Sequence, residues 1–271
     1  MSIAISAKLA FHLPEPTDVL LQLEAATIPE QQIIAAHTSV PKAFETARIS
    51  AQDDIGERIW VRAQGDYIVE YEAEVEPVRI LADLATLDSV ELRNLPSEAT
   101  QYLFDSRYCL GQTFQDFVSN TFGDASGSVS GGAKIAAMQN WLFENFQYVP
   151  GASNSMTTAV DSFHEQRGIC RDYAHVLISF ARAAAIPARY VSCYAPGVTP
   201  QDFQAVAEVF LADPASPTGG GWLLVDATRM ADPARTVKIG VGRDAADVSF
   251  LTVFGAARFD ETRVRAREIP A

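Results

Sequence analysis

The chain has 271 residues, 48% of them hydrophobic, so it is long enough and apolar enough to fold around one or two buried cores. Its 34 acidic residues outnumber its 21 basic ones, and the formal net charge is -13. An acidic chain is repelled by phosphate backbones and by anionic lipid, so we exclude nucleic acid and membrane surfaces as main partners.

Residues 1–77 carry the alternating pattern of antiparallel β-strands. Apolar side chains recur at every second position within residues 3–13, and residues 67–76 alternate apolar or aromatic side chains with glutamates. Turns rich in proline, glycine and aspartate separate these runs at intervals typical of a small sandwich. We therefore predict an N-terminal antiparallel β-sandwich domain over residues 1–90, with the glutamate row on its solvated face.

After residue 90 the composition becomes typical of helices. Short helices are predicted over residues 98–108, 114–121 and 159–166, and a longer amphipathic helix over residues 134–146. The Gly- and Ser-rich residues 123–132 predict an exposed loop.

The most informative stretch runs from residue 167 to residue 189. Gly168 predicts a flexible turn, Cys170 begins a stripe of apolar residues at helical spacing, and Pro187 ends the helix. A cysteine in the first turn of a helix lies at the positive end of the macrodipole, which favours thiolate over thiol. A small buried hydrophobic residue would occupy the same position equally well. Cys170 is therefore a candidate nucleophile that this pattern alone does not decide.

Three strands are predicted after this helix, over residues 188–194, 203–211 and 222–226, and residues 237–241 are also extended. Helices followed by antiparallel strands make an α+β domain, which we assign to residues 91–271. Residues 240–245 imitate a dinucleotide-binding fingerprint, but too few residues remain after them for a βαβ unit. We expect no cofactor.

Cysteine and histidine usage argues against a disulfide framework and against a metal site. The three cysteines, Cys109, Cys170 and Cys193, are an odd number, and the N-terminal residues lack the apolar core of a secretory signal. Neither they nor the four histidines have metal-ligand spacing. We therefore expect reduced thiols, no bound metal, no membrane span and a cytoplasmic location.

Several short motifs together resemble the bacterial transglutaminase-like proteins. The motifs are SRYC at residues 106–109, RGICRDYAH at 167–175, AIPARY at 185–190, GW at 221–222, VDAT at 225–228 and GRDAAD at 242–247. The resemblance covers about residues 100–255, and the preceding β segment is similar to a small N-terminal domain often found in this group.

The resemblance implies a papain-like core that carries out amide acyl transfer with a cysteine, a histidine and an aspartate. Cys170 matches the nucleophile and Asp226 the acid that orients the base, but the position of the histidine holds Gln204. A carboxamide neither accepts the thiol proton nor forms the imidazolium that stabilises a thiolate. By analogy with a serine triad, this loss costs on the order of 10⁵ to 10⁶ in rate. We therefore predict an inactive or strongly impaired protein that still binds peptide or protein segments.

Two alternatives stay open at this stage. The first is an active cysteine protease, amidase or acyltransferase that takes its base from His164, His175 or the substrate. His175 lies five positions after Cys170, about 140° around the helix. The second is a non-catalytic scaffold whose N-terminal sheet edge engages a partner. Whether the protein is an enzyme, its substrate, the choice between hydrolysis and cross-linking, and its oligomeric state are not decided by the sequence.

Overall fold

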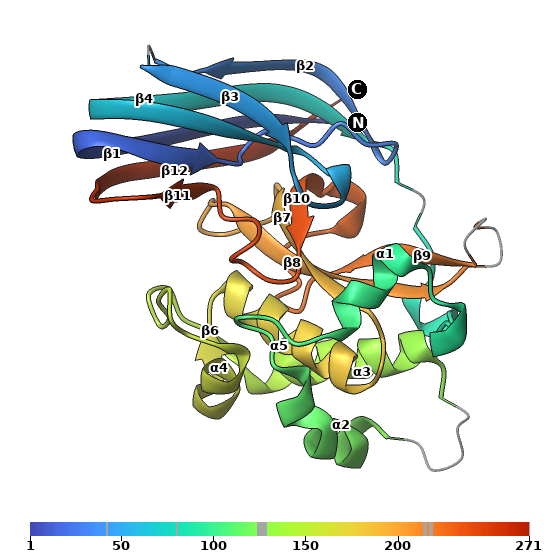
Figure 1. The fold of residues 1–271 in the computed structure, drawn as a ribbon. Coiled ribbons are helices and arrows are strands. Elements are labelled where there is room, and N and C mark those ends of the chain that lie inside the picture. The colour runs from blue at the N-terminus through green and yellow to red at the C-terminus, as the bar shows by residue number, and fades with distance from the viewer. Residues whose placement is uncertain (42, 80, 124–128, 214–215, 217–218, 271) are drawn as a thin grey trace.

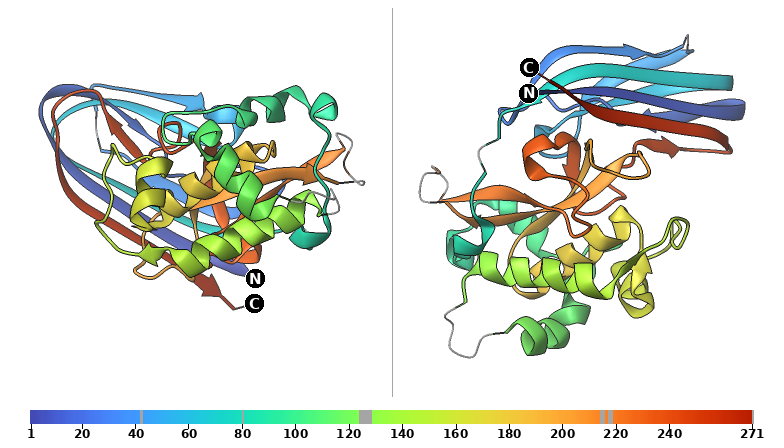
Figure 2. Two further views of the ribbon diagram at one scale, coloured as in Figure 1. Left: turned by 90° about the horizontal axis from the view of Figure 1, so that it is seen from below. Right: turned by 180° about the vertical axis from the view of Figure 1, so that it is seen from behind.

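A computed structural model describes residues 1–41, 43–79, 81–123, 129–213, 216 and 219–270, and it has an α+β fold with antiparallel sheets (Figure 1). The elements form three layers: one large sheet, a smaller central sheet, and a layer of helices (Figures 1 and 2). In the part of the chain that the structure describes, no helix is both long and apolar enough to cross a membrane.

The N-terminal residues build the large sheet, in the order β11-β1-β4-β2, with β12 also paired to β1 and β3 to β4. The strands are β1 (Ser2–Leu21), β2 (Gln31–Ser39), β3 (Glu45–Ser50), β4 (Glu57–Pro77), β11 (Leu251–Val253) and β12 (Arg258–Ile269). Alternate residues of β1 and β4 are buried, as the period of two predicts.

The central sheet has the order β10-β7-β8-β9 and is buried on both faces. Its strands are β7 (Ala188–Tyr194), β8 (Gln204–Ala212), β9 (Gly220–Val225) and β10 (Val237–Gly242). Tyr194 and Ile239 share one apolar cluster with Leu9 and Val69 of the large sheet. The N-terminal strands thus supply one layer of the sandwich, and the central sheet supplies the second.

The helices cover the other face of the central sheet (Figure 1). They are α1 (Ser97–Thr100), α2 (Gln115–Phe122), α3 (Gly131–Asn145), α4 (Ala159–Glu165) and α5 (Cys170–Ala183). Short 3-10 turns are η1 (Gln52–Asp54), η2 (Leu84–Thr86), η3 (Leu92–Asn94), η4 (Gln101–Leu103), η5 (Gly111–Phe114) and η6 (Pro233–Arg235), and β5 (Gln147–Tyr148) pairs in parallel with β6 (Arg167–Gly168). Apart from Arg171 and the terminal Ala183, α5 is buried throughout.

Two predicted boundaries in the helical part need correction. The helix expected over residues 98–108 ends its α-helical part at Thr100 and continues only as the turn η4. Of the loop expected over residues 123–132, residues 124–128 lie outside the described residues, whereas Gly131 and Gly132 already belong to α3. A side chain at Gly132 would lie 1.7 Å from the Leu84 carbonyl oxygen, so glycine is required there by close packing.

The C-terminal strands, within the residues that we assigned to the second unit, pair with the large sheet. β12 pairs with residues 2–12 of β1, and β11 pairs with residues 19–21 of the same strand. The chain therefore returns to the large sheet after building the central one. We missed these strands because only Val264 and Ala266 of β12 are buried, between charged neighbours. The division of the chain into two domains stays a prediction.

A buried ionic cluster in the central sheet extends to two connections between strands of the large sheet. Glu208 on β8 pairs with Lys238 on β10 and with Arg189 on β7, where Nε lies 2.8 Å from Glu208 Oε2. Lys238 Nζ also lies 2.8 Å from Glu30 Oε2, and Arg189 Nη1 lies 3.1 Å from Asp53 Oδ2. Although burial raises the pKa of Glu208, the two cations outweigh it and bring the pKa to about 2. Charges of the central sheet are thus neutralised by one another and by carboxylates from the connections of the large sheet.

Candidate active site

Cys170 is the first residue of α5, and Asp172 holds the start of this helix in place. The Asp172 carboxylate accepts hydrogen bonds from the backbone N–H of Ile169 (2.8 Å) and from the hydroxyl of Ser153 (2.5 Å). A Cβ at Gly168 would lie 2.5 Å from Asp172 Cβ. Gly168 is therefore needed for close approach, and not for the turn that we predicted, since its φ is not positive.

The Cys170 sulfur is almost completely buried, with 8% of the residue exposed. Burial raises the pKa of the thiol to about 12, and the nearby carboxylates of Asp226 and Asp202 act in the same direction. The backbone N–H groups of Ala205 and Arg171 near the sulfur oppose this shift. Desolvation thus outweighs the helix terminus that we expected to favour thiolate, and Cys170 is a thiol at neutral pH.

Gln204 begins β8 and is 2% exposed. Its Nε2 donates to Asp226 Oδ2 at 3.3 Å and to Thr228 Oγ1 at 3.3 Å. Its Oε1 is buried and has no hydrogen-bond partner among the described residues. The amide is therefore oriented through its nitrogen, and the acceptor oxygen is left without a donor.

Asp226 follows β9 and is surrounded by donors. It accepts hydrogen bonds from the backbone N–H groups of Thr228 (2.8 Å) and Ala231 (2.7 Å) and from the Thr228 hydroxyl (2.7 Å). Burial raises the pKa of Asp226, and these hydrogen bonds oppose the shift. Sequence reasoning missed Thr228, although a threonine two residues after an aspartate is a common turn pattern that the VDAT motif already contained.

The structure brings Gln204 and Asp226 into contact and places Cys170 and Gln204 in the lining of one cleft of about 620 Å³. The Cys170 thiol contacts the Phe203 carbonyl oxygen at 4.0 Å, and no hydrogen bond joins the sulfur to the Gln204 side chain within the described ranges. The catalytic roles of Cys170, Gln204 and Asp226 stay predictions.

Aromatic side chains form the walls of this cleft. Tyr148 and Tyr190 lie on the side of the helices, and Phe203 stacks on Phe250 with ring centroids 4.5 Å apart. Burial raises the pKa of Tyr148 to about 12, and the Cys170 sulfur adds to the shift. The walls are thus apolar rings in contact with a candidate nucleophile, which suits a ligand that is itself partly apolar.

None of the four histidines, all of which the structure describes, lines the cleft. His175 is fully buried between Tyr108 and Tyr190, and its Nε2 accepts a hydrogen bond from the Ala245 N–H at 3.2 Å. Burial and two neighbouring arginines hold the pKa of His175 well below its usual value. His164 is exposed on α4. His175 is therefore a neutral core residue, as its position on the helix predicted.

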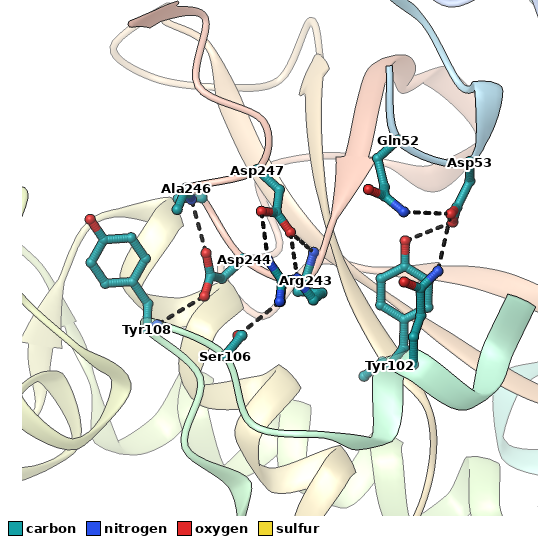
Figure 3. Close-up of polar contacts among 12 residues, drawn as sticks. Gln52, Asp53, Tyr102, Ser106, Tyr108, Arg243, Asp244, Ala246 and Asp247 are labelled. Carbon is teal, nitrogen blue, oxygen red and sulfur yellow. Dashed lines mark hydrogen bonds and ion pairs between the residues drawn. The ribbon is translucent and has the colours of Figure 1, made fainter. Parts of the chain in front are cut away.

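Polar contacts hold the GRDAAD segment in place beside Ser106 and Tyr108 (Figure 3). Arg243 pairs with Asp247 (Nε to Oδ2, 2.9 Å), and Asp244 accepts hydrogen bonds from the backbone N–H groups of Tyr108 and Ala246, each at 2.9 Å. These contacts confirm the prediction that the charged residues of this motif are structural. The dinucleotide-like glycines lie in β10, which is a strand of the central sheet.

Other reactive groups are buried away from the cleft. Cys109 and Cys193 are both fully buried, and burial raises the pKa of Cys109 to about 12 and also raises that of Cys193. Within the ranges that the structure describes, no group of three or more His, Cys, Asp or Glu side chains is placed to hold a metal ion.

Comparison with known proteins agrees with this geometry. Residues 117–227, which include Cys170, Gln204 and Asp226, match the transglutaminase-like superfamily. These residues form a transglutaminase-like domain. The crystal structure of a candidate cysteine protease from Cytophaga hutchinsonii superposes with a TM-score of 0.86 at 28% identity, covering 100% of this chain and 91% of that one.

Two further proteins are more distant. An uncharacterized protein of Mycobacterium leprae is 28% identical over 119 residues, so the chain spans 42% of the length of that relative. The periplasmic domain of TgpA from Pseudomonas aeruginosa aligns with 81% of this chain and 72% of its own, with 19% identity and a TM-score of 0.41. Residues 117–227 thus match a transglutaminase-like family, and the chain as a whole has a fold of the cysteine-protease-like kind.

Proposed function

We propose that this transglutaminase-like protein binds peptide or protein segments in the Cys170 cleft, and that its acyl-transfer or hydrolytic chemistry is absent or strongly impaired. One observation carries the proposal. Gln204 occupies the place beside Asp226 where the reaction needs a group that exchanges protons, and it offers Asp226 only an amide N–H. A cytoplasmic location remains a prediction from the sequence.

The missing function is proton transfer. Attack on an amide requires the thiol to lose a proton and the leaving amine to gain one, and a single base normally does both. Gln204 does neither, and with the pKa of the Cys170 thiol at about 12 the thiolate fraction at pH 7 is on the order of 10⁻⁵. The Asp226 carboxylate accepts a hydrogen bond from the Gln204 carboxamide, which does not exchange protons.

Binding does not require the missing base. The cleft has a volume of about 620 Å³, aromatic walls, and backbone N–H groups near the sulfur, and none of these depends on a base. A cleft of this size, mostly apolar with a few convergent polar groups, is typical of a ligand site. The protein therefore retains the means to hold a peptide beside a sulfur that does not attack it.

The test is the Gln204→His variant. We expect it to release ammonia from a glutamine peptide, or to incorporate a labelled primary amine into casein, whereas the parent protein does neither. Gln204→Asn is the matched control, since it changes the side chain and keeps the carboxamide. Adding Cys170→Ala to Gln204→His should abolish the new activity. Multiple turnovers by the parent protein would refute the proposal.

One observation favours the alternative of an active enzyme with another base. Asp202 lines the same cleft, and burial raises its pKa, although the Phe203 N–H opposes the shift. A carboxylate with a raised pKa is a better base than an ordinary one. If the parent protein turns over, Asp202→Asn should remove that activity, and Asp213→Asn, outside the cleft lining, should not.

A further inference from the structure

We infer that the cleft takes an extended polypeptide, which pairs as an added strand with the free edge of β11. The inference rests on the proposed function and names the ligand class of the same site. β11 hydrogen-bonds to β1 on one side and ends the path β11-β1-β4-β2 through the large sheet. Figures 1 and 2 both show it at the border of that sheet facing the helical layer.

The cleft meets β11 along its edge. Four consecutive residues, 250–253, line the cleft together with Cys170. Successive side chains of a strand point to opposite faces of the sheet, so a void that touches only one face would contact alternate residues. Contact with all four residues therefore places the void beside the strand, where its unpaired backbone groups are.

The hydrogen bonds to β1 show which backbone groups are unpaired. Phe250 accepts from the Gln22 N–H at 3.1 Å, and Phe254 donates to the Asp18 carbonyl at 2.9 Å. In an antiparallel pair the N–H and C=O of one residue point to the same side, and the sides alternate along the strand. Leu251 and Val253 therefore direct their backbone groups away from β1.

These outward groups are largely unused. The Leu251 carbonyl accepts a hydrogen bond from the Ser249 hydroxyl at 2.8 Å. Among the residues that the structure describes, the Leu251 N–H and both backbone groups of Val253 have no partner. Two donors and one acceptor thus face the cleft at the spacing of a strand.

The sequence of β11 does nothing to protect this edge. Proteins usually block exposed strand edges with proline, with charged side chains or with a covering element. β11 reads Leu251-Thr252-Val253, with neither proline nor charge, and all three residues are half-buried beside the cleft. An uncharged edge next to a candidate nucleophile is suited to pairing with an incoming strand.

The chemistry of these groups identifies the ligand. Alternating donors and acceptors are matched by another extended backbone, and the apolar rings of Phe203 and Phe250 accept side chains at alternate positions. Main-chain pairing tolerates many side chains. The occupant is therefore an unfolded segment of polypeptide of broad sequence, and a folded protein surface does not fit.

The first experiment uses reduced, carboxamidomethylated α-lactalbumin as the unfolded probe and the native protein as its matched control. The parent chain should bind the unfolded form and not the native one. Short capped peptides from the bound region are then N-methylated at one position at a time. Alternate positions should weaken binding roughly tenfold, since their N–H groups donate to the Val253 carbonyl and, as a second bond beside the one from Ser249, to the Leu251 carbonyl; intervening positions should change Kd little.

The second experiment changes the strand itself. Val253→Pro removes an outward N–H without removing a bond to β1, and Val253→Ala keeps that N–H. We expect Val253→Pro to lose about tenfold or more in affinity and Val253→Ala to stay near the parent, with equal melting temperatures. If Val253→Pro does not fold, the N-methyl scan on the parent chain still decides.

Three results would overturn the inference: no binding of the unfolded probe, equal binding of its native form, or loss of affinity without alternation along the peptide. These results are separable from the proposed function. Activity of Gln204→His without alternation in the scan refutes strand pairing alone. Alternation without any activity of Gln204→His refutes the proposed role of Gln204 alone.

Discussion

Gln204 and Glu208 lie on the same strand, β8, and both are buried, yet the pKa values of the acidic groups at the two positions are shifted in opposite directions. Near Glu208, Lys238 and Arg189 bring the pKa of the carboxylate to about 2. Near Gln204, no cation accompanies Cys170 or Asp226 among the described ion pairs, and burial raises the pKa of both. Burial alone therefore favours the neutral form, and at Glu208 two buried cations reverse it.

This comparison explains why one glutamine matters so much. A histidine at position 204 would supply the cation that the Cys170 end of the strand lacks. The surroundings of Gln204 and of Glu208 then differ in the presence of a positive partner, and each prediction below adds or removes that partner or a neighbour of it.

The largest effect is expected for Gln204→His on the ionisation of Cys170. The imidazolium should lower the pKa of the thiol, because a neighbouring cation stabilises the thiolate. The rate of iodoacetamide labelling at pH 7 should rise by about a hundredfold or more over the parent, whose rate should climb only at strongly alkaline pH. Unchanged labelling in the variant would show that the imidazole does not reach the sulfur. Cys170→Ala is the control for labelling at the other thiols.

The largest loss of stability is expected when Glu208, in the middle of β8, loses its charge. Glu208→Gln leaves Lys238 and Arg189 buried without their shared partner, and we expect a loss of about 3–5 kcal/mol in the free energy of unfolding. Urea unfolding measures this loss. The double change Glu208→Gln with Lys238→Met should recover part of it, because one unpaired charge is also removed. A loss under about 1 kcal/mol would contradict the assignment of the cluster as a link between the central sheet and the connections of the large sheet.

The pH dependence of stability should follow the same carboxylate. The pKa of Glu208 is lowered on folding, so its contribution is fully present above its unfolded pKa of 4.5 and is lost as the pH falls toward about 2. The free energy of unfolding of the parent should therefore drop between pH 4.5 and 2. Glu208→Gln should show a smaller slope in that window, and an equal slope would assign the acid sensitivity to other groups.

The smallest effect is expected at Thr228. Thr228→Val keeps the shape of the side chain and removes the hydroxyl that bonds Asp226 and accepts from Gln204. We expect a loss of about 1–2 kcal/mol in the free energy of unfolding, measured by urea. In the Gln204→His background the same change should also lower the new activity, since Asp226 is less firmly held. Thr236→Val, which removes a hydroxyl bond to the Asp232 carbonyl outside the site, is the matched control.

Local patterns predicted the elements near the site well. The strand over residues 188–194 agrees with the prediction residue for residue, and the helix that begins at Cys170 starts where the apolar stripe and Gly168 placed it. The contact of Gln204 with Asp226 was expected from the resemblance and is present at 3.3 Å. These features depend on neighbours in the chain, or on motifs that are themselves short.

Features that depend on distant residues were not predicted. β12 pairs with β1 across almost the whole length of the chain, and its own pattern of exposed charges gives little sign of a strand. The free edge of β11 beside the cleft was not predicted for the same reason. Pairing with residues 19–21 of β1 decides which backbone groups of β11 are left unpaired.

The sequence by itself determined the α+β class, the helix at Cys170 and the replacement of the expected base by Gln204, because periodicity and side-chain chemistry are properties of the residues. Only the tertiary structure decided that Cys170 is held as a thiol, that Glu208 is held as an anion, and that β11 presents a free edge to the cleft. The physical reason is that desolvation, ion pairing and strand pairing depend on which residues far apart in the chain come together, and no local pattern records that.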